Sequence, residues 1–132
     1  MQRIMFKSKI HRAHITEANL YYEGSLTIDQ DLMKEADLLP HEKISVVNIN
    51  NGERFETYVI PGESGKRQIC LNGAAARKGS VGDEVILISY ANVDENEIEN
   101  FQPTVILVDK DNNIVSKTHS MEPNTTFARS DL

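Results

Sequence analysis

Short apolar runs rich in β-branched residues recur along the chain, and the turn residues between them constrain its fold. The clearest pair of runs is EKISVVNIN at 42–50 and RFETYVI at 54–60. Asn50, Asn51 and Gly52 lie between these runs, and an Asn-Gly pair in such a place is the strongest short signal of a β-hairpin. The pattern predicts a small, mainly β domain.

Similar runs predict further strands. Residues 84–90 (EVILISY) and 104–109 (TVILVD) are almost continuously apolar, which is typical of strands buried on both faces. The other expected strands are one or two within 1–16, one at 68–72, and one at 114–117 after a turn at 111–113.

Three short helices are expected between the strands. Asp29 is placed to cap a helix that runs to Leu38, and Pro40 is placed to end it. Residues 74–78 suit a turn or two of helix, and the acidic segment 92–100 is the third candidate. Many short strands joined by brief helices indicate a small mixed β-barrel.

Length and charge limit the domain count and the partners. The 132 residues suffice for one domain, which we place at 1–117; residues 118–132 show no periodicity and are expected to be a mobile tail or to dock on a neighbour. A net charge of −6 argues against nucleic acid and anionic membranes as partners. No run approaches the ~20 apolar residues of a membrane span, and the N-terminus lacks the apolar region of a signal peptide. The lone Cys70 excludes an intrachain disulfide, so we expect a cytoplasmic protein.

Each residue that could carry chemistry also has an ordinary structural explanation. Gly24-Ser25 alone is typical of a turn, and the G-x-S-x-G elbow of serine hydrolases is absent. The four histidines and Cys70 form no zinc pattern, so no metal is expected. Lys9 and His11 share one face of the expected strand, where charged residues usually meet solvent.

Two later segments offer further candidates. On the expected strand at 54–60, Arg54 faces one side with Glu56, whereas Thr57 faces the other side with Phe55. Tyr58 is by itself typical of half-buried packing. The segment 72–76 (NGAAA) would suit a tight turn, and its small residues would also let a ligand approach backbone N–H groups.

Three stretches, taken together, resemble the pyruvoyl-dependent aspartate decarboxylase family. They are KSKIHRAHITEANLYYEGSLTID at 7–29, NINNGERFETYVI at 48–60 and ICLNGAAARKGSVGDEVILISYA at 69–91, and PTVILVD at 103–109 continues the match less distinctively. The resemblance implies a six-stranded double-psi β-barrel with short helices that assembles as a homotetramer.

The resemblance also implies that the chain is a proenzyme, or zymogen, that cuts itself between Gly24 and Ser25. The Ser25 hydroxyl would attack the Gly24 carbonyl, and elimination and hydrolysis would leave a pyruvoyl group at the start of fragment 25–132. Glycine at position 24 keeps the attacked carbonyl uncrowded. Thr57 is implied as the donor to the oxyanion during processing, and as a substrate contact afterwards.

By the same resemblance, the mature protein converts L-aspartate to β-alanine and CO2 for pantothenate biosynthesis. The pyruvoyl group at position 25 would form a Schiff base with the aspartate amine and accept the electrons released on decarboxylation. Tyr58 is implied as the proton donor to Cα. Arg54 and Lys9 are expected to hold the substrate carboxylates. Neither an external organic cofactor nor a metal is required.

The remaining residues of the implied site line its walls. Gly73, Ala74 and Ala75 match the backbone turn that contacts substrate, Asn72 lies beside it, and His11 and Tyr22 are second-rank lining residues. Some of these residues could come from a neighbouring subunit. The main alternative is a non-catalytic barrel that serves as a binding or regulatory module, because a fold alone does not fix function.

Overall fold

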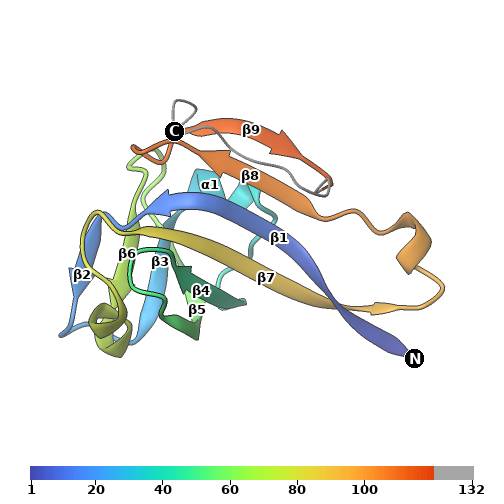
Figure 1. Ribbon diagram of the computed structural model, residues 1–132, viewed down its shortest axis with the longest axis horizontal. Coiled ribbons are helices and arrows are strands. Elements are labelled where there is room, and N and C mark those ends of the chain that lie inside the picture. The colour runs from blue at the N-terminus through green and yellow to red at the C-terminus, as the bar shows by residue number, and fades with distance from the viewer. Residues whose placement is uncertain (121–132) are drawn as a thin grey trace.

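A computed structural model of the protein describes residues 1–120 as one connected, mainly β structure (Figure 1). The expected β class is confirmed. In chain order the elements are β1 (Gln2–His14), β2 (Glu17–Asn19), β3 (Ser25–Asp29), the α-helix α1 (Gln30–Glu35), β4 (Lys43–Asn48), β5 (Arg54–Gly62), β6 (Ile69–Asn72), the 3-10 helix η1 (Gly73–Lys78), β7 (Glu84–Asp94), the 3-10 helix η2 (Ile98–Asn100), β8 (Thr104–Val108) and β9 (Ile114–Thr118).

The strands form a mixed sheet in the order β2-β6-β3-β5-β4-β7-β1-β8-β9. The pairs β1/β8, β2/β6 and β3/β5 are parallel and the other neighbours are antiparallel. Nine strands within residues 1–120 exceed the six of the expected barrel, and its double-psi type stays a prediction from the resemblance. The expected tail lies mostly at 121–132, outside the described residues.

The first sixteen residues form one long strand and one very short one. β1 pairs with β7 along most of its length, and its register shifts between Phe6 and Ser8 and between Ile10 and Ala13. These two bulges bend the strand, and Arg12 takes a left-handed backbone conformation at the second one. Residues 2–6 of β1, paired with 90–94 of β7, form an arm that extends beyond the rest of the sheet (Figure 1).

The expected hairpin and the first expected helix are both confirmed. Gly52 has φ +77° in the turn between β4 and β5, and its N–H donates to the Asn48 carbonyl at 2.9 Å. The Asp29 carboxylate accepts from the Asp31 N–H at 2.7 Å and so caps α1. The helix ends earlier than expected because Asp37, at φ +56°, turns the chain before Pro40 is reached.

Two expectations for the second half of the chain are wrong. The helix predicted at 92–100 is helical only at Ile98–Asn100, because β7 continues to Asp94 to pair with the start of β1. β7 is also not buried on both faces in the single chain: its residues alternate, and Tyr90 is 46% exposed. β8 matches the expectation, since residues 105–108 are all buried.

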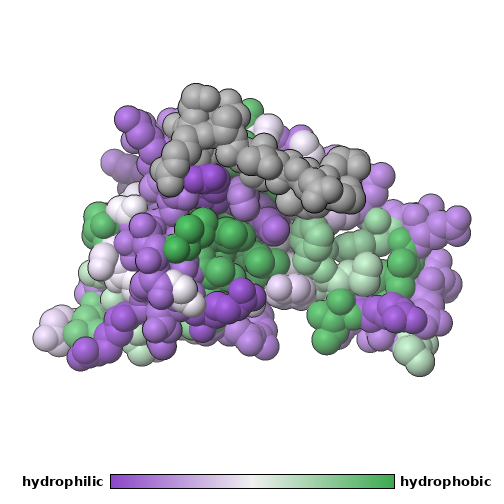
Figure 2. Space-filling view, viewed as in Figure 1, coloured by the Kyte–Doolittle hydropathy of each residue, from purple (hydrophilic) through white to green (hydrophobic). Residues whose placement is uncertain are grey.

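The core lies under the central strands and α1. Leu26, Ile28, Leu32, Val46 and Val59 are fully buried in it. Apolar side chains also remain at the surface, and Figure 2 shows them over the middle of the molecule and along the arm. No helix within residues 1–120 is long and apolar enough to cross a membrane.

Candidate active site

Ser25 lies at the start of β3, between β5 and β6 (Figure 1). The pair Gly24-Ser25 therefore leads into a strand, which the sequence interpretation had not identified at 25–29. Ser25 pairs with Asn72 at the end of β6, and Thr27 pairs with Cys70. Directly paired residues on antiparallel strands share a face, so these four side chains lie together.

Hydrogen bonds join three of these side chains. Asn72 Nδ2 donates to Ser25 Oγ at 3.0 Å and to Thr27 Oγ1 at 2.8 Å. Ser25 Oγ donates in turn to the Glu23 carbonyl at 3.1 Å. Ser25 is fully buried and Asn72 is 3% exposed, so water competes little for these contacts.

Gly73 brings the start of η1 against the backbone that precedes Ser25. Its φ is +63°, and a Cβ at this position would lie 2.7 Å from Gly24 Cα, Gly24 N and the Tyr22 carbonyl oxygen. Only glycine fits this close approach. The sequence predicted that the small residues here would let a ligand approach backbone N–H groups; in the structure, backbone atoms of Tyr22 and Gly24 of the same chain lie against Gly73.

The register of β3 on β5 places two further predicted residues beside the Gly24–Ser25 bond. Leu26 is level with Val59 in this parallel pair. The pairing begins at Leu26; continued one residue back it would bring Ser25 level with Tyr58, and Gly24 and Thr57 line one hollow. Because side chains alternate along a strand, Tyr58 lies on the Ser25 face and Thr57 on the opposite face.

Two hollows lie near these residues, and Gly24 lines one of them. One, of about 230 Å³, is lined by residues that include Gly24, Thr57, Ala74 and Ala75. The other, of about 310 Å³, is lined by residues that include Tyr22, Thr27, Cys70 and Asn72. The tertiary structure thus brings a buried serine, an amide and a threonine to one peptide bond whose glycine lines a hollow.

Comparison with known proteins identifies the family of this chain. Residues 1–115 match the aspartate decarboxylase family. A protein of Syntrophobacter fumaroxidans named aspartate 1-decarboxylase is 60% identical over 117 residues, which cover 89% of this chain and 94% of the relative. Proteins of the same name from Aliarcobacter butzleri and Heliobacterium modesticaldum are 58% and 62% identical, over 89% and 88% of this chain and 93% and 88% of their own.

The chain belongs to the aspartate decarboxylase family. It is accordingly an enzyme, of the carboxy-lyase class.

In this member of the aspartate decarboxylase family, neither predicted cation lines the two hollows near Ser25. Arg54 lines a separate hollow of about 270 Å³ that shares Phe55 and Glu56 with the hollow beside Thr57. Lys9 lies on β1, which is separated from β3 in the sheet order by β5, β4 and β7. Its ammonium lies 5.7 Å from the centre of the Phe6 ring.

His11, predicted as a lining residue, is uncharged at neutral pH. Burial, and then the positive charges of Lys9 and Arg12, lower the pKa of its imidazole to about 4, against a weaker opposite effect of Glu84. It therefore adds no positive charge for a carboxylate. Three residues apart on a regular strand, His11 and His14 would lie on opposite faces. The register shift between Ile10 and Ala13 interrupts this alternation of side chains along β1.

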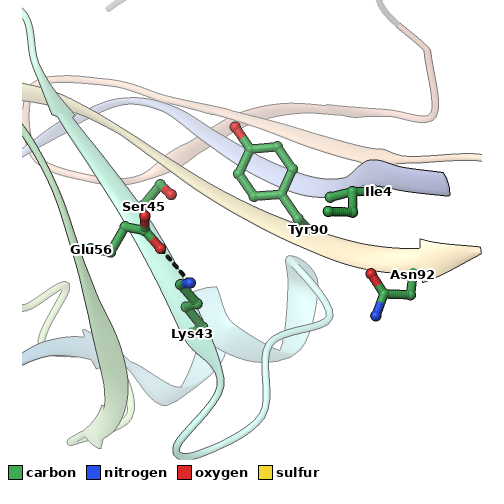
Figure 3. A pocket seen from close by; sticks show the side chains of 6 residues that line it. All are labelled: Ile4, Lys43, Ser45, Glu56, Tyr90 and Asn92. Atoms are coloured by element: carbon green, nitrogen blue, oxygen red, sulfur yellow. Dashed lines mark ion pairs between the residues drawn. The ribbon is translucent and has the colours of Figure 1, made fainter.

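A further hollow, of about 560 Å³, shares Glu56 with the hollows beside Arg54 and Thr57. It is formed by Ile4, Lys43, Ser45, Glu56, Tyr90 and Asn92, and an ion pair between Lys43 and Glu56 of 2.6 Å crosses one wall (Figure 3). None of the predicted site residues lines it. Within residues 1–120, no group of three or more His, Cys, Asp or Glu side chains could hold a metal ion.

Thr27 and Cys70 belong to the polar cluster but were not predicted as site residues. Cys70 lies on the strand that the sequence predicted at 68–72. Side chains two residues apart on a strand share a face, so Thr27 lies on the face of Ser25 and Cys70 on the face of Asn72. The sequence could show each of these relations, but only the pairing of β3 with β6 brings the two faces together.

Proposed function

We propose that this chain is the precursor of a pyruvoyl-dependent enzyme that converts L-aspartate to β-alanine and CO2. It matures by cutting itself between Gly24 and Ser25, and its product serves pantothenate biosynthesis. The observation that carries the proposal is the buried Ser25 hydroxyl, held by Asn72 at a glycine peptide bond that faces a hollow.

The proposed cleavage uses groups that surround this bond. Ser25 Oγ attacks the Gly24 carbonyl carbon, the bond to the Ser25 nitrogen breaks, and an ester results. Thr57 donates a hydrogen bond to the oxyanion that forms during this attack. Thr57 and Gly24 line the same hollow, which supports the assignment.

The surroundings of position 25 fit a carbonyl-bearing group. Asn72 presents an N–H to an oxygen on this residue, and both Ser25 and Asn72 are buried. A pyruvoyl group here supplies an electron sink for loss of the substrate α-carboxylate. Tyr58, beside Ser25 in the strand register, holds on its phenol oxygen the proton for the substrate Cα.

Two cations match the two carboxylates of aspartate. Arg54 can bind one carboxylate through two parallel hydrogen bonds, whereas Lys9 can neutralise one as a point charge. Gly73, Ala74 and Ala75 supply the turn against which the substrate rests.

We further propose that the mature enzyme is a homotetramer in which a neighbouring copy brings Lys9 to the site. The distance of β1 from β3 in the sheet order supports this arrangement. Ile4 is 75% exposed and Tyr90 is 46% exposed on the arm, which leaves apolar surface for a second copy to cover.

Mass spectrometry under denaturing conditions tests the proposal directly. Incubation of the purified protein at raised temperature should give a fragment 1–24 and a fragment 25–132 that is lighter by one ammonia. The matured sample should form β-alanine from aspartate, and the Ser25→Ala variant should remain whole and inactive. A wild-type chain that stays intact and forms no β-alanine would favour the non-catalytic binding module.

A further inference from the structure

We propose that Cys70 and Thr27 are positioning residues for the Asn72 amide and, through it, for the Ser25 hydroxyl during self-cleavage. The proposal rests on the self-cleavage proposed above and extends it to two residues to which no role in the reaction has been assigned.

The contacts of Ser25 fix which way the Asn72 amide must face. The single hydroxyl proton of Ser25 is donated to the Glu23 carbonyl, so Oγ can only accept from its other neighbour. The NH2 end of the amide must therefore point at Ser25, and its second N–H reaches Thr27 Oγ1 at 2.8 Å. The carbonyl end then points away from both hydroxyls.

Cys70 supplies the partner for that carbonyl end. Its Sγ lies 3.1 Å from Asn72 Oδ1, and both residues are buried. Burial, and secondarily the negative charge of Glu17, raise the pKa of the thiol to about 11, so the S–H proton is present at neutral pH. The buried amide thus has both of its ends satisfied, which opposes its rotation.

The strand pairing explains why these residues meet. Ser25 is opposite Asn72 and Thr27 is opposite Cys70 in the antiparallel β3/β6 pair, so all four occupy one face. Leu26 and Leu71, one position along, are opposite each other in the core. The pairing therefore holds the amide between a thiol on one side and two hydroxyls on the other.

The orientation of the amide matters to both bond changes at Ser25. As the Oγ–C bond to Gly24 forms and the C–N bond breaks, the hydroxyl proton passes to the Ser25 nitrogen, and the Asn72 N–H holds Oγ at the carbonyl. Water then takes the Cα proton, the electrons of that bond form a Cα–Cβ double bond, and the Cβ–Oγ bond breaks, so that Oγ departs in the Gly24 carboxylate. The same N–H stabilises the charge of this carboxylate, and hydrolysis by water finally releases the nitrogen of position 25 as ammonia. A rotated amide would present Oδ1 to Oγ and oppose both changes.

The test compares paired variants by their rate of self-cleavage. Precursor purified in the cold soon after induction is warmed, and the intact fraction is followed by denaturing mass spectrometry. Cys70→Ala should slow cleavage by roughly three- to tenfold, the worth of one buried hydrogen bond. Cys70→Ser keeps a donor and should cleave near the wild-type rate. Thr27→Val removes the hydroxyl and should likewise slow cleavage, whereas Thr27→Ser keeps it and should cleave near the wild-type rate.

Ile69→Val is the matched control, because it trims a buried side chain on the same strand without touching the amide. It should lower the Tm and leave the cleavage rate unchanged. Equal rates for Cys70→Ala and Cys70→Ser in a wild-type background that cleaves would overturn the positioning role alone. The positioning role would also be overturned if Ile69→Val slowed cleavage, relative to its loss of Tm, as much as Cys70→Ala does. A wild-type chain that never cleaves would refute the positioning role and the proposed function together.

Discussion

Gly73 illustrates how one residue's backbone conformation governs the candidate site. Its positive φ starts η1, and the missing side chain leaves room for the Tyr22–Gly24 backbone. The hydrogen bond between Asn72 and Ser25 depends on this approach, since Asn72 is the preceding residue. A change at Gly73 therefore affects both folding and the reactive serine.

Gly73→Ala should strongly slow self-cleavage and destabilise the protein by about 3 kcal/mol or more, because a left-handed φ and a backbone clash combine. Gly52→Ala is the matched control: its φ is +77°, but no atom lies within 4 Å of the added Cβ. It should cost only about 1–2 kcal/mol and leave cleavage unchanged. Urea denaturation measures the loss of stability, and the cleavage time course measures the loss of rate. Equal losses of stability for the two variants would contradict the role of the clash between the added Cβ and the Tyr22–Gly24 backbone.

Tyr58→Phe separates the two stages of the proposed chemistry. The phenol is assigned to protonation of the substrate, so the variant should mature normally and lose β-alanine formation by roughly 10²-fold or more. Thr57→Val should instead impair maturation, because its hydroxyl is assigned to the oxyanion. Mass spectrometry reports maturation and a β-alanine assay reports turnover. Normal turnover by Tyr58→Phe would refute the proton-donor role.

At the scale of elements, the end of β3 and the start of α1 are joined by one buried carboxylate. Asp29 caps the helix and also accepts from the Arg67 N–H at 2.6 Å and the Gly65 N–H at 3.4 Å. It thereby ties the β5–β6 loop to the strand that carries Ser25. A single side chain sets the positions of three segments.

Asp29→Ala should lower the free energy of unfolding by about 2–4 kcal/mol, since it removes the cap and leaves buried N–H groups without partners. Asp29→Asn keeps one acceptor oxygen and should cost about half as much. Asp31→Ala removes one contact with the exposed Ser64 and should cost no more than about 1 kcal/mol. Chemical denaturation of the three variants gives the ranking, and an Asp29→Ala loss as small as that of Asp31→Ala would refute the account.

At the scale of the whole molecule, the proposed site is incomplete in one chain. Tyr58 and Thr57 accompany Ser25 through the β3/β5 register, whereas Lys9 is on a distant strand. The arm and its exposed apolar residues offer a surface through which copies can associate. The assembly, rather than the chain, would then form the complete substrate site.

Co-expression of Lys9→Ala with Ser25→Ala tests this arrangement. Each variant alone should be impaired, the first by about 10- to 100-fold through loss of a charge-assisted contact and the second completely. Mixed tetramers should regain β-alanine formation, because an intact Lys9 then meets a matured position 25 on another copy. Tyr58→Phe with Ser25→Ala is the control and should regain nothing, since Tyr58 lies beside its own Ser25. If co-expression of Lys9→Ala with Ser25→Ala restored no β-alanine formation, Lys9 would not act in the site of a neighbouring copy.

The sequence alone determined those features that depend on neighbouring residues. The Asn50–Gly52 turn, the Asp29 cap and the short helix after Asn72 follow from local backbone preferences, and all three are confirmed. The family was also readable, because its motifs are contiguous stretches of the chain.

The tertiary structure decided what depends on pairing between distant segments. β7 extends to Asp94 because β1 is there to accept its hydrogen bonds, which no local pattern in 92–100 could reveal. Thr27 and Cys70 join Asn72 and Ser25 only because β3 pairs with β6 in one register. A register is a choice among many pairings of similar local energy, and the packing of the whole core makes that choice.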